Sequence, residues 1–203
     1  MDVRTGTDAT AETVVQGRPD VVVLATGARP RRPRWAGASG RVVDVRDVLE
    51  GRARPSGTVL VVDELGFHQG TSVAEFVADA GCAVTICTPG MIVGQDLGIT
   101  LDLEGWNRRA HGKGITQVTD VVPTGCEAAD GGRLAVTLLH HPTGELRQLT
   151  VDWVVSSAHQ QPEDDLWKEL ADSGIEVHRV GDALAPRRAH SAVIEGERVA
   201  LAL

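Results

Sequence analysis

A glycine-bearing turn between a buried strand and a helix can bind phosphate through its backbone N–H groups, and residues 63–70 form such a turn. Residues 58–62 before it are apolar and β-branched, and residues 71–80 after it carry apolar side chains at helical spacing. In a dinucleotide-binding loop, successive glycines make the turn, admit the pyrophosphate and let helix and strand pack closely. Dinucleotide binding is therefore the chemistry to look for at this turn.

Only the last of those glycines is present. When the turn is aligned on the helix, Gly70 takes the third position and leaves Leu65 and Phe67 at the first and second. Two side chains then occupy the space that a diphosphate needs, and acidic residues stand beside a helix N-terminus that should attract an anion. We therefore expect a degenerate dinucleotide loop, which has lost tight binding of NAD(P), at Asp63, Glu64, Gly66 and Gly70.

The turn lies inside a predicted βαβ unit. The helix starts with Thr71 or Ser72 as its N-cap and stops at Gly81, and residues 83–87 form a second strand of the buried type. The connection should be right-handed and the two strands parallel. The second strand ends without the acidic residue that would hold a ribose hydroxyl. The unit is thus the opening of a Rossmann-like α/β domain.

A second candidate site combines two distant segments. Residues 20–24 form a hydrophobic strand that runs into Ala25-Thr26-Gly27, where a glycine without a Cβ lets backbone N–H groups approach a cofactor. Near the other end, Gly181-Asp182 precede a closing helix at residues 190–203. Taken singly, the first motif equally fits a strand that ends at a glycine turn, and the second fits a helix N-cap.

The rest of the chain predicts a mixed fold. Residues 133–139 and 147–155 read as strands joined by a turn at 142–144, which predicts an antiparallel hairpin. Further elements are expected at residues 2–4 (strand), 9–15 (helix), 41–49 (strand then helix), 101–111 (helix) and 115–122 (strand). The closing helix offers apolar side chains for burial at Val193, Ile194, Val199 and Leu201.

Composition excludes several kinds of partner. The chain has 203 residues, of which 42% are hydrophobic and 24% charged, and its formal net charge is −8. That acidic balance argues against nucleic acid and anionic membranes as partners, and the sequence shows no signal peptide or membrane-spanning segment. An odd set of cysteines without metal-ligand spacing predicts reduced structural thiols in a cytoplasmic protein, and neither a metal site nor an iron–sulfur cluster, at Cys82, Cys87 and Cys126.

Three separated motifs resemble a known superfamily. Residues 20–30 resemble the strand-plus-ATG motif of the flavoprotein disulfide-reductase superfamily, and Gly181-Asp182 before a helix resembles its second flavin motif. More narrowly, the glycine-poor turn after Val62, the strand at residues 84–89 and residues 181–186 resemble the trimethylamine dehydrogenase family. The related 2,4-dienoyl-CoA reductase and old-yellow-enzyme-fused oxidoreductases share the same C-terminal nucleotide-binding region. The resemblance covers nearly the whole chain.

The resemblance implies a fold and a set of cofactor ligands. It implies an α/β fold in which a Rossmann-like NAD(P)-type domain, a parallel βαβ unit plus an antiparallel hairpin, is inserted in a partial FAD/ADP-binding domain. The implied limits are 55–175 for the inserted domain, and 1–54 with 176–203 for the partial one. FAD or ADP, shared with a partner chain, would lie against Ala25, Thr26, Gly27, Gly181 and Asp182, whose carboxylate would take ribityl or ribose hydroxyls.

Other parts of the family pattern are missing from this sequence. They are the FMN-bearing barrel, the cysteines of a [4Fe–4S] cluster and the first G-x-G-x-x-G of the adenine-nucleotide domain. The present chain is then either a fragment or a natural small subunit that a larger partner chain completes. We expect the second arrangement, in which the partner chain carries these parts. Electrons would leave through an external carrier such as an electron-transfer flavoprotein or a ferredoxin.

Three functions are compatible with these observations. The first is the small subunit of a heteromeric flavin/iron–sulfur oxidoreductase that oxidises or demethylates an amine, with no catalytic residue in this chain. The second is part of an NAD(P)H-dependent FAD/FMN reductase of the dienoyl-CoA-reductase type, which the βαβ topology favours and the degenerate loop opposes. The third is a non-catalytic scaffold, or a docking subunit for an electron carrier.

Overall fold

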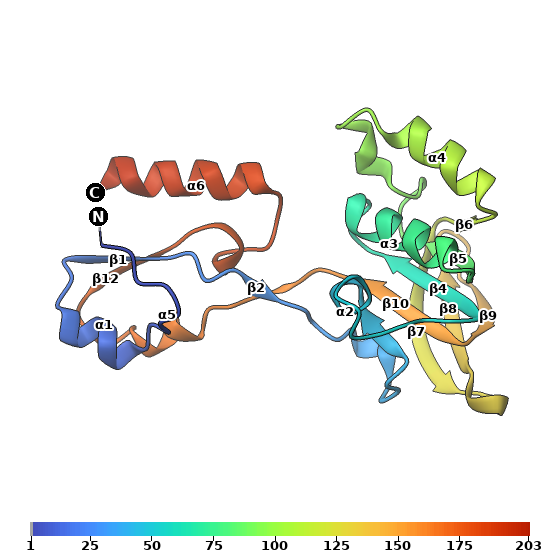
Figure 1. Cartoon of the computed structure of the whole chain (residues 1–203), viewed down its shortest axis with the longest axis horizontal. Coiled ribbons are helices and arrows are strands. Elements are labelled where there is room, and N and C mark those ends of the chain that lie inside the picture. The colour runs from blue at the N-terminus through green and yellow to red at the C-terminus, as the bar shows by residue number, and fades with distance from the viewer. Residues whose placement is uncertain (1) are drawn as a thin grey trace. The chain divides into compact units, whose positions relative to one another are not determined.

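The computed structural model describes residues 2–203, which form two compact units (Figure 1). The first, called the core unit, is Arg31–His159. The second, called the terminal unit, combines the described residues up to Pro30 with Gln160–Leu203. No helix within residues 2–203 combines the length and the apolar character needed to cross a bilayer.

A five-stranded parallel sheet forms the centre of the core unit. Its strand order is β3-β10-β4-β5-β6. The predicted βαβ unit is confirmed, because β4 and β5 pair in parallel and α3 connects them. The bounds are β3 (Val42–Asp44), β10 (Trp153–Ser157), β4 (Thr58–Asp63), β5 (Ala83–Cys87), β6 (Thr116–Val118) and α3 (His68–Asp79).

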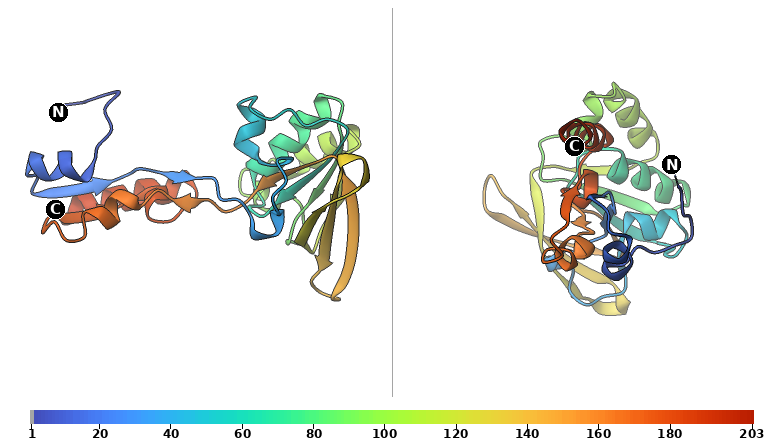
Figure 2. Two further views of the ribbon diagram at one scale, coloured as in Figure 1. Left: turned by 90° about the horizontal axis from the view of Figure 1, so that it is seen from below. Right: turned by 90° about the vertical axis from the view of Figure 1, so that its left-hand side faces the viewer.

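The parallel sheet is covered on both faces. On one face, the helices α2 (Val45–Leu49), α3 and α4 (Leu103–Gly112) enclose an apolar cluster that includes Val61 and the almost fully buried Trp106. On the other face, Leu60 and Val62 pack against the antiparallel sheet β7-β8-β9 (Figure 2). The bounds are β7 (Val121–Ala128), β8 (Leu134–His140) and β9 (Glu145–Val151), and short 3-10 turns lie at η1 (Arg34–Ala36), η2 (Gln95–Gly98) and η3 (Asp130–Gly132).

The antiparallel hairpin β8–β9 is confirmed, but several element limits differ from the predicted ones. The predicted strand 147–155 divides at Asp152 into β9 and β10, which lie in different sheets. The predicted strand 115–122 divides likewise at Asp120, whose φ of +59° breaks the extended backbone. No strand forms at residues 2–4.

The start of α3 also differs from the predicted one. The helix begins at His68 with Phe67 as its N-cap, so neither Thr71 nor Ser72 caps it. Thr71 already lies inside the first turn, where its backbone N–H and its hydroxyl both donate to the carbonyl of Phe67. Its side chain therefore bonds back to the preceding turn instead of capping the helix.

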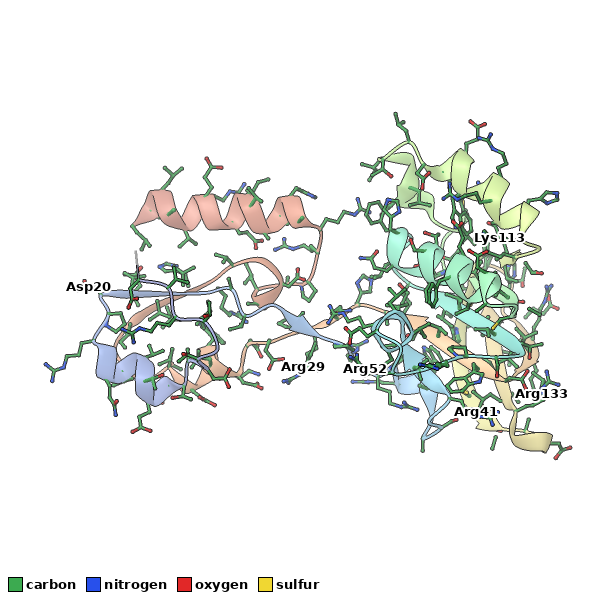
Figure 3. The ribbon with its side chains drawn as sticks, in the orientation of Figure 1. Asp20, Arg29, Arg41, Arg52, Lys113 and Arg133 are labelled. Carbon is green, nitrogen blue, oxygen red and sulfur yellow. The ribbon has the colours of Figure 1, made fainter. Side chains whose placement is uncertain are left out.

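The terminal unit has little sheet and few buried side chains. Its strands β1 (Val21–Leu24) and β12 (Glu176–Arg179) pair in parallel, while β2 (Ala28–Arg29) and β11 (Gln161–Pro162) pair antiparallel. Arg29, labelled in Figure 3, forms ion pairs with Glu163 and Asp165. The helices of this unit are α1 (Ala11–Gly17), α5 (Asp165–Glu169) and α6 (Ala189–Ala202), with the 3-10 turn η4 (Gly181–Ala183).

The closing helix α6 has no buried residue among those described. Its apolar side chains Val193 and Leu201 are 69% and 81% exposed, and Ile194 is 42% exposed. Three of the four apolar side chains that the sequence predicts to be buried are thus exposed, while the fourth, Val199, is half-buried.

The limits of the two compact units differ from the limits implied by the sequence. Residues 31–54 lie in the core unit because β3 pairs with β10 and α2 packs on the same sheet. Residues 160–175 lie in the terminal unit, where β11 pairs with β2.

Asp152 connects the two sheets of the core unit. Its carboxylate accepts hydrogen bonds from the backbone N–H and the hydroxyl of Thr58, at 2.8 and 2.7 Å. The guanidinium of Arg133, labelled in Figure 3, lies 3.5 Å from the same carboxyl group. The bonds from Thr58 lower the pKa of Asp152, so folding is favoured by its ionised form.

We predict that Asp152→Asn lowers the melting temperature at pH 7 but has less effect in acid. The folded state holds the pKa of Asp152 below its unfolded value of about 4, so its stabilisation is present above that value and is lost as pH falls through the folded pKa. Thermal melts between pH 3 and pH 7 check this. The exposed pair Glu145–Arg147 supplies the control Glu145→Gln, for which we expect little change. Equal losses in the two variants would contradict the prediction.

Close packing of α3 on β4 requires the absence of a side chain at Gly70. A Cβ built there would lie 2.5 Å from the Cγ of Asp63. We predict that Gly70→Ala lowers the free energy of unfolding by about 1–3 kcal/mol, the usual cost of overpacking. Urea denaturation measures it.

The matched control for this change is Gly112→Ala, at the end of α4, where no atom lies within 4 Å of an added Cβ. This variant should be neutral or more stable by up to about 1 kcal/mol, as expected for alanine in a helix. If both variants lost equal stability, contact with Asp63 would not be the cause.

Candidate functional site

The degenerate turn lies at the carboxyl edge of the parallel sheet, beside the point where strand order changes direction. From β4 the chain proceeds through α3 to β5 on one side, while β10 lies on the other. In open α/β sheets, ligands bind in the crevice outside the carboxyl ends of the strands at such a point. Here Asp63 and Ser157 are in register at the ends of β4 and β10, and both are almost fully buried.

The carboxylate of Asp63 is held by the backbone of its own turn. Its Oδ1 accepts hydrogen bonds from the N–H groups of Leu65 and Gly66, at 3.2 and 3.0 Å. Gly66 has a φ of +61°, which a glycine adopts without strain. Its Oδ2 is buried and accepts no hydrogen bond from the described residues. Burial raises the pKa of Asp63 to about 6, although the two N–H donors favour the ionised form.

The residues predicted for the degenerate loop are brought together, with Asp63 innermost. Asp63 lies beneath Gly70 in the first turns of α3, and Glu64 donates its backbone N–H to the carbonyl of Ser157 at 3.0 Å. The carbonyl of Gly66 accepts from the backbone N–H of Asp96, which joins the turn to the segment after β5. Two donors of this turn are thus engaged by a carboxylate of the same chain.

Two further polar groups at this edge were not predicted from the sequence. The hydroxyl oxygens of Ser156 and Ser157 are buried and have no hydrogen-bond partner among residues 2–203. Only the register of β10 against β4 brings them to the turn, and that pairing joins segments about ninety residues apart. Together with Asp63, they make this edge polar inside an otherwise apolar unit.

The second predicted site lies in the terminal unit, where its two motifs share one sheet edge. Ala25-Thr26-Gly27 follow β1, and Gly181-Asp182 come two residues after β12, its parallel neighbour. The pairing continues beyond the strands, because Val180 donates its N–H to the carbonyl of Leu24 at 3.0 Å. All the residues predicted to hold FAD or ADP are therefore at the carboxyl end of the β1–β12 pair.

The ATG segment is exposed but anchored. The hydroxyl of Thr26 donates to the carbonyl of Glu163, and the carbonyl of Gly27 accepts from the N–H of the same residue at 2.9 Å. Ala25 and Thr26 are exposed, and no atom lies within 4 Å of a Cβ added at Gly27. There is consequently space for a ligand to approach the backbone of Gly27.

The Gly181-Asp182 turn is bound to α6. Gly181 donates its N–H to Oε2 of Glu195 at 2.8 Å, and its φ of +61° suits glycine. Oδ1 of Asp182 accepts from the backbone N–H of Arg187 at 3.1 Å. Glu195 was not predicted from the sequence, since nothing in the spacing of residues 181 and 195 indicates that they meet. One carboxylate oxygen of Asp182 is thus used to hold the turn.

Other candidate residues have structural partners. His140 and His141 contact Thr143 and the carbonyl of Pro89 respectively. Within the described residues, no group of three or more His, Cys, Asp or Glu side chains is arranged to hold a metal ion.

Comparison with known proteins shows which proteins this chain is similar to. No protein-family model matches it. N,N-dimethylglycine/sarcosine dehydrogenase of Chromohalobacter salexigens is 28% identical, over 98% of this chain and 34% of the relative. A probable N-methylproline demethylase of Rhizobium meliloti is 28% identical over 94% and 32%, and an NADH oxidase of Thermoanaerobacter brockii is 30% identical over 98% and 30%. The chain spans about a third of the length of these relatives.

Solved structures agree with these relatives. A histamine dehydrogenase from Rhizobium sp. 4-9 has a TM-score of 0.81 at 26% identity, over 97% of this chain and 32% of that one. A 6-hydroxypseudooxynicotine amine oxidase from Pseudomonas geniculata N1 has a TM-score of 0.82 at 26% identity, over 95% and 30%. A flavoprotein disulfide reductase from Escherichia coli shares the fold alone, with a TM-score of 0.61 at 18% identity, over 87% and 42%. The resemblance to the trimethylamine dehydrogenase-like family is confirmed: homologues of this chain include amine dehydrogenases and demethylases, and it corresponds to about a third of their length.

Proposed function

We propose that this chain is the nucleotide-binding and assembly part of a flavin-dependent oxidoreductase that dehydrogenates or demethylates an amine. The observation that carries this proposal is the similarity, over 98% of the chain, to a dimethylglycine/sarcosine dehydrogenase. A demethylase and a histamine dehydrogenase that are similar over 94% and 97% of the chain support the same class of substrate. The amine itself would be oxidised in the part of the enzyme that this chain does not contain.

We infer that FAD or ADP would bind at one edge of the terminal unit. The open space beside Gly27 would admit a nucleotide, and the carboxylate of Asp182, whose Oδ1 accepts from the N–H of Arg187, would accept a ribityl or ribose hydroxyl. Thr26 would position this backbone through its bond to Glu163. When bound there, a flavin would supply electron transfer, and the residues of this chain would orient it.

A larger partner would complete the terminal unit. A parallel pair of four-residue strands is too small to be stable alone, and α6 buries none of its residues. We propose a partner chain with the FMN barrel, the [4Fe–4S] cluster and the first phosphate loop, and an electron-transfer flavoprotein or ferredoxin as acceptor. The length of the relatives, about three times that of this chain, supports such a partner.

A second candidate function is that of an NAD(P)H-fed reductase. The NADH oxidase relative and the Rossmann-like topology favour it. The state of the turn opposes it, since two of its donors are taken by Asp63 and two glycines are replaced by Leu65 and Phe67. A non-catalytic scaffold or carrier-docking role is the third.

The proposal is tested on the complex purified from its own cells. Native mass spectrometry should show this chain with a larger one, and the absorption spectrum should show flavin and iron–sulfur bands. Under anaerobic conditions, a methylated amine such as dimethylglycine should bleach the flavin while NADH should not. Bleaching by NADH alone would favour the reductase, and a colourless, stably folded single chain would overturn the enzyme-subunit proposal.

We further predict that Asp182→Ala lowers the affinity of the assembled complex for FAD or ADP by about tenfold, the value of one charge-assisted hydrogen bond. Nucleotide content after gel filtration measures this affinity. Asp172→Ala is the matched control, because Asp172 is exposed and lies outside the site. A thermal melt separates loss of the ligand contact from loss of the bond to Arg187. Unchanged nucleotide content in a folded Asp182→Ala complex would remove Asp182 from the site.

A further inference from the structure

The turn that follows β4 contains its own anion. In a dinucleotide loop, the N–H groups after the strand point at the phosphate oxygens of the ligand. Here the N–H groups of Leu65 and Gly66 point at Oδ1 of Asp63. The acceptor that a phosphate oxygen would supply is therefore already present, as a carboxylate oxygen.

The same carboxyl group lies against the beginning of α3. Its Cγ is 2.5 Å from the position of a Cβ at Gly70, so it fills the space that the third glycine of the fingerprint keeps open. The N-cap of α3, Phe67, provides no side-chain hydrogen bond to the free N–H groups of the helix. The positive end of the helix dipole favours a negative group at this place.

Asp63 is also fully buried and lacks a cationic partner. Its exposed fraction is 0%, and none of the ion pairs found within residues 2–203 includes it. The titratable groups that interact electrostatically with Asp63 are Glu64 of the turn, Asp96 of η2 and Cys87 of β5. The residues that α3 and β10 place next to Asp63 are uncharged, namely Gly70 and Ser157. Since burial of an unpaired carboxylate is costly, the two N–H donors and the helix end are what hold it there.

We propose that Asp63 is the residue that excludes dinucleotide phosphates from this turn, because its carboxylate engages the backbone donors that a pyrophosphate would need. A phosphate group would have to displace this carboxylate and meet its charge at close range. The sequence predicts an obstruction by the size of Leu65 and Phe67, but the structure packs Phe67 against the apolar core cluster. Asp63 acts differently, by occupying the donors and by repulsion. This role is independent of the proposed function, since it concerns only the binding of phosphate by the core unit.

The test is a titration of the full-length chain with inorganic pyrophosphate, followed by ¹H–¹⁵N NMR of the amides of Leu65, Gly66 and Gly70. Pyrophosphate contains no adenine or flavin, so the site in the terminal unit does not determine the result. In the wild-type chain these amides should not shift. In Asp63→Ala they should shift in a saturable way, with at least tenfold tighter binding, or about 1.4 kcal/mol.

The variant Glu64→Gln separates occupation of the two N–H donors from the general effect of negative charge at the turn. Glu64→Gln removes the neighbouring charge but frees neither of the two N–H groups, so it should bind pyrophosphate as weakly as the wild-type chain. Asp63→Ser is a second replacement in case Asp63→Ala does not fold. Wild-type binding equal to that of folded Asp63→Ala or Asp63→Ser would overturn the proposal. So would a gain in Glu64→Gln equal to that in Asp63→Ala.

The wild-type chain supplies an independent measurement. Because burial raises the pKa of Asp63 to about 6, the amides of Leu65 and Gly66 should titrate together with its side-chain carboxyl carbon near pH 6. The ionised form is disfavoured in the folded state, so wild type should lose stability relative to Asp63→Asn as pH rises from about 4 to above 6. Amides that do not follow the Asp63 carboxyl carbon would show that the carboxylate does not engage these donors, and the proposal would fail.

Discussion

The core unit depends on the position of β10, which returns to the parallel sheet between β3 and β4 after the chain has built the antiparallel sheet. This return places Ser157 opposite Asp63 and gives the sheet its change of direction at the carboxyl edge. Asp152 stabilises the return, because its carboxylate accepts hydrogen bonds from Thr58 at the start of β4 where the chain passes from one sheet to the other. One of the two apolar clusters lies on each face of this parallel sheet.

The two candidate sites differ in how their backbone donors are used. In the core unit, Asp63 accepts hydrogen bonds from the N–H groups of its own turn, which on our proposal closes this polar edge to phosphate. In the terminal unit, the exposed segment at Gly27 leaves room for a ligand while Glu163 and Glu195 hold the backbone around it. This difference between the two sites is compatible with the proposed enzyme, in which a nucleotide is retained for structure or electron transfer and an amine supplies the electrons.

Sequence patterns predicted the βαβ unit, the hairpin and the segments of the two candidate sites, because apolar runs and turn residues act locally. They did not predict that α3 begins directly after Phe67, because Phe67 has no side chain that can cap a helix. Thr71 has such a side chain, but its hydroxyl donates to the carbonyl of Phe67 inside the first turn. They also missed the engaged state of Asp63, since the burial of a carboxylate depends on packing between β4 and α3. The hydrogen bond between Gly181 and Glu195 was not predicted either, because the irregular segment between η4 and α6 brings the two residues together and carries no sequence pattern that indicates this.

Because α6 is weakly attached, we expect it to become rigid later than the central strands of the core unit. The helix is held mainly at Gly181, through Glu195 and the contact of the glycine with Ala192, and none of its residues is buried. A helix with so little buried surface opens at low free energy, so its amide hydrogens exchange with solvent long before those of β4 or β5. Capture of α6 by another surface would stop that exchange and fix the Gly181-Asp182 turn at the same moment. Ordering of the candidate nucleotide-binding edge at Gly181-Asp182 would in this way be coupled to assembly.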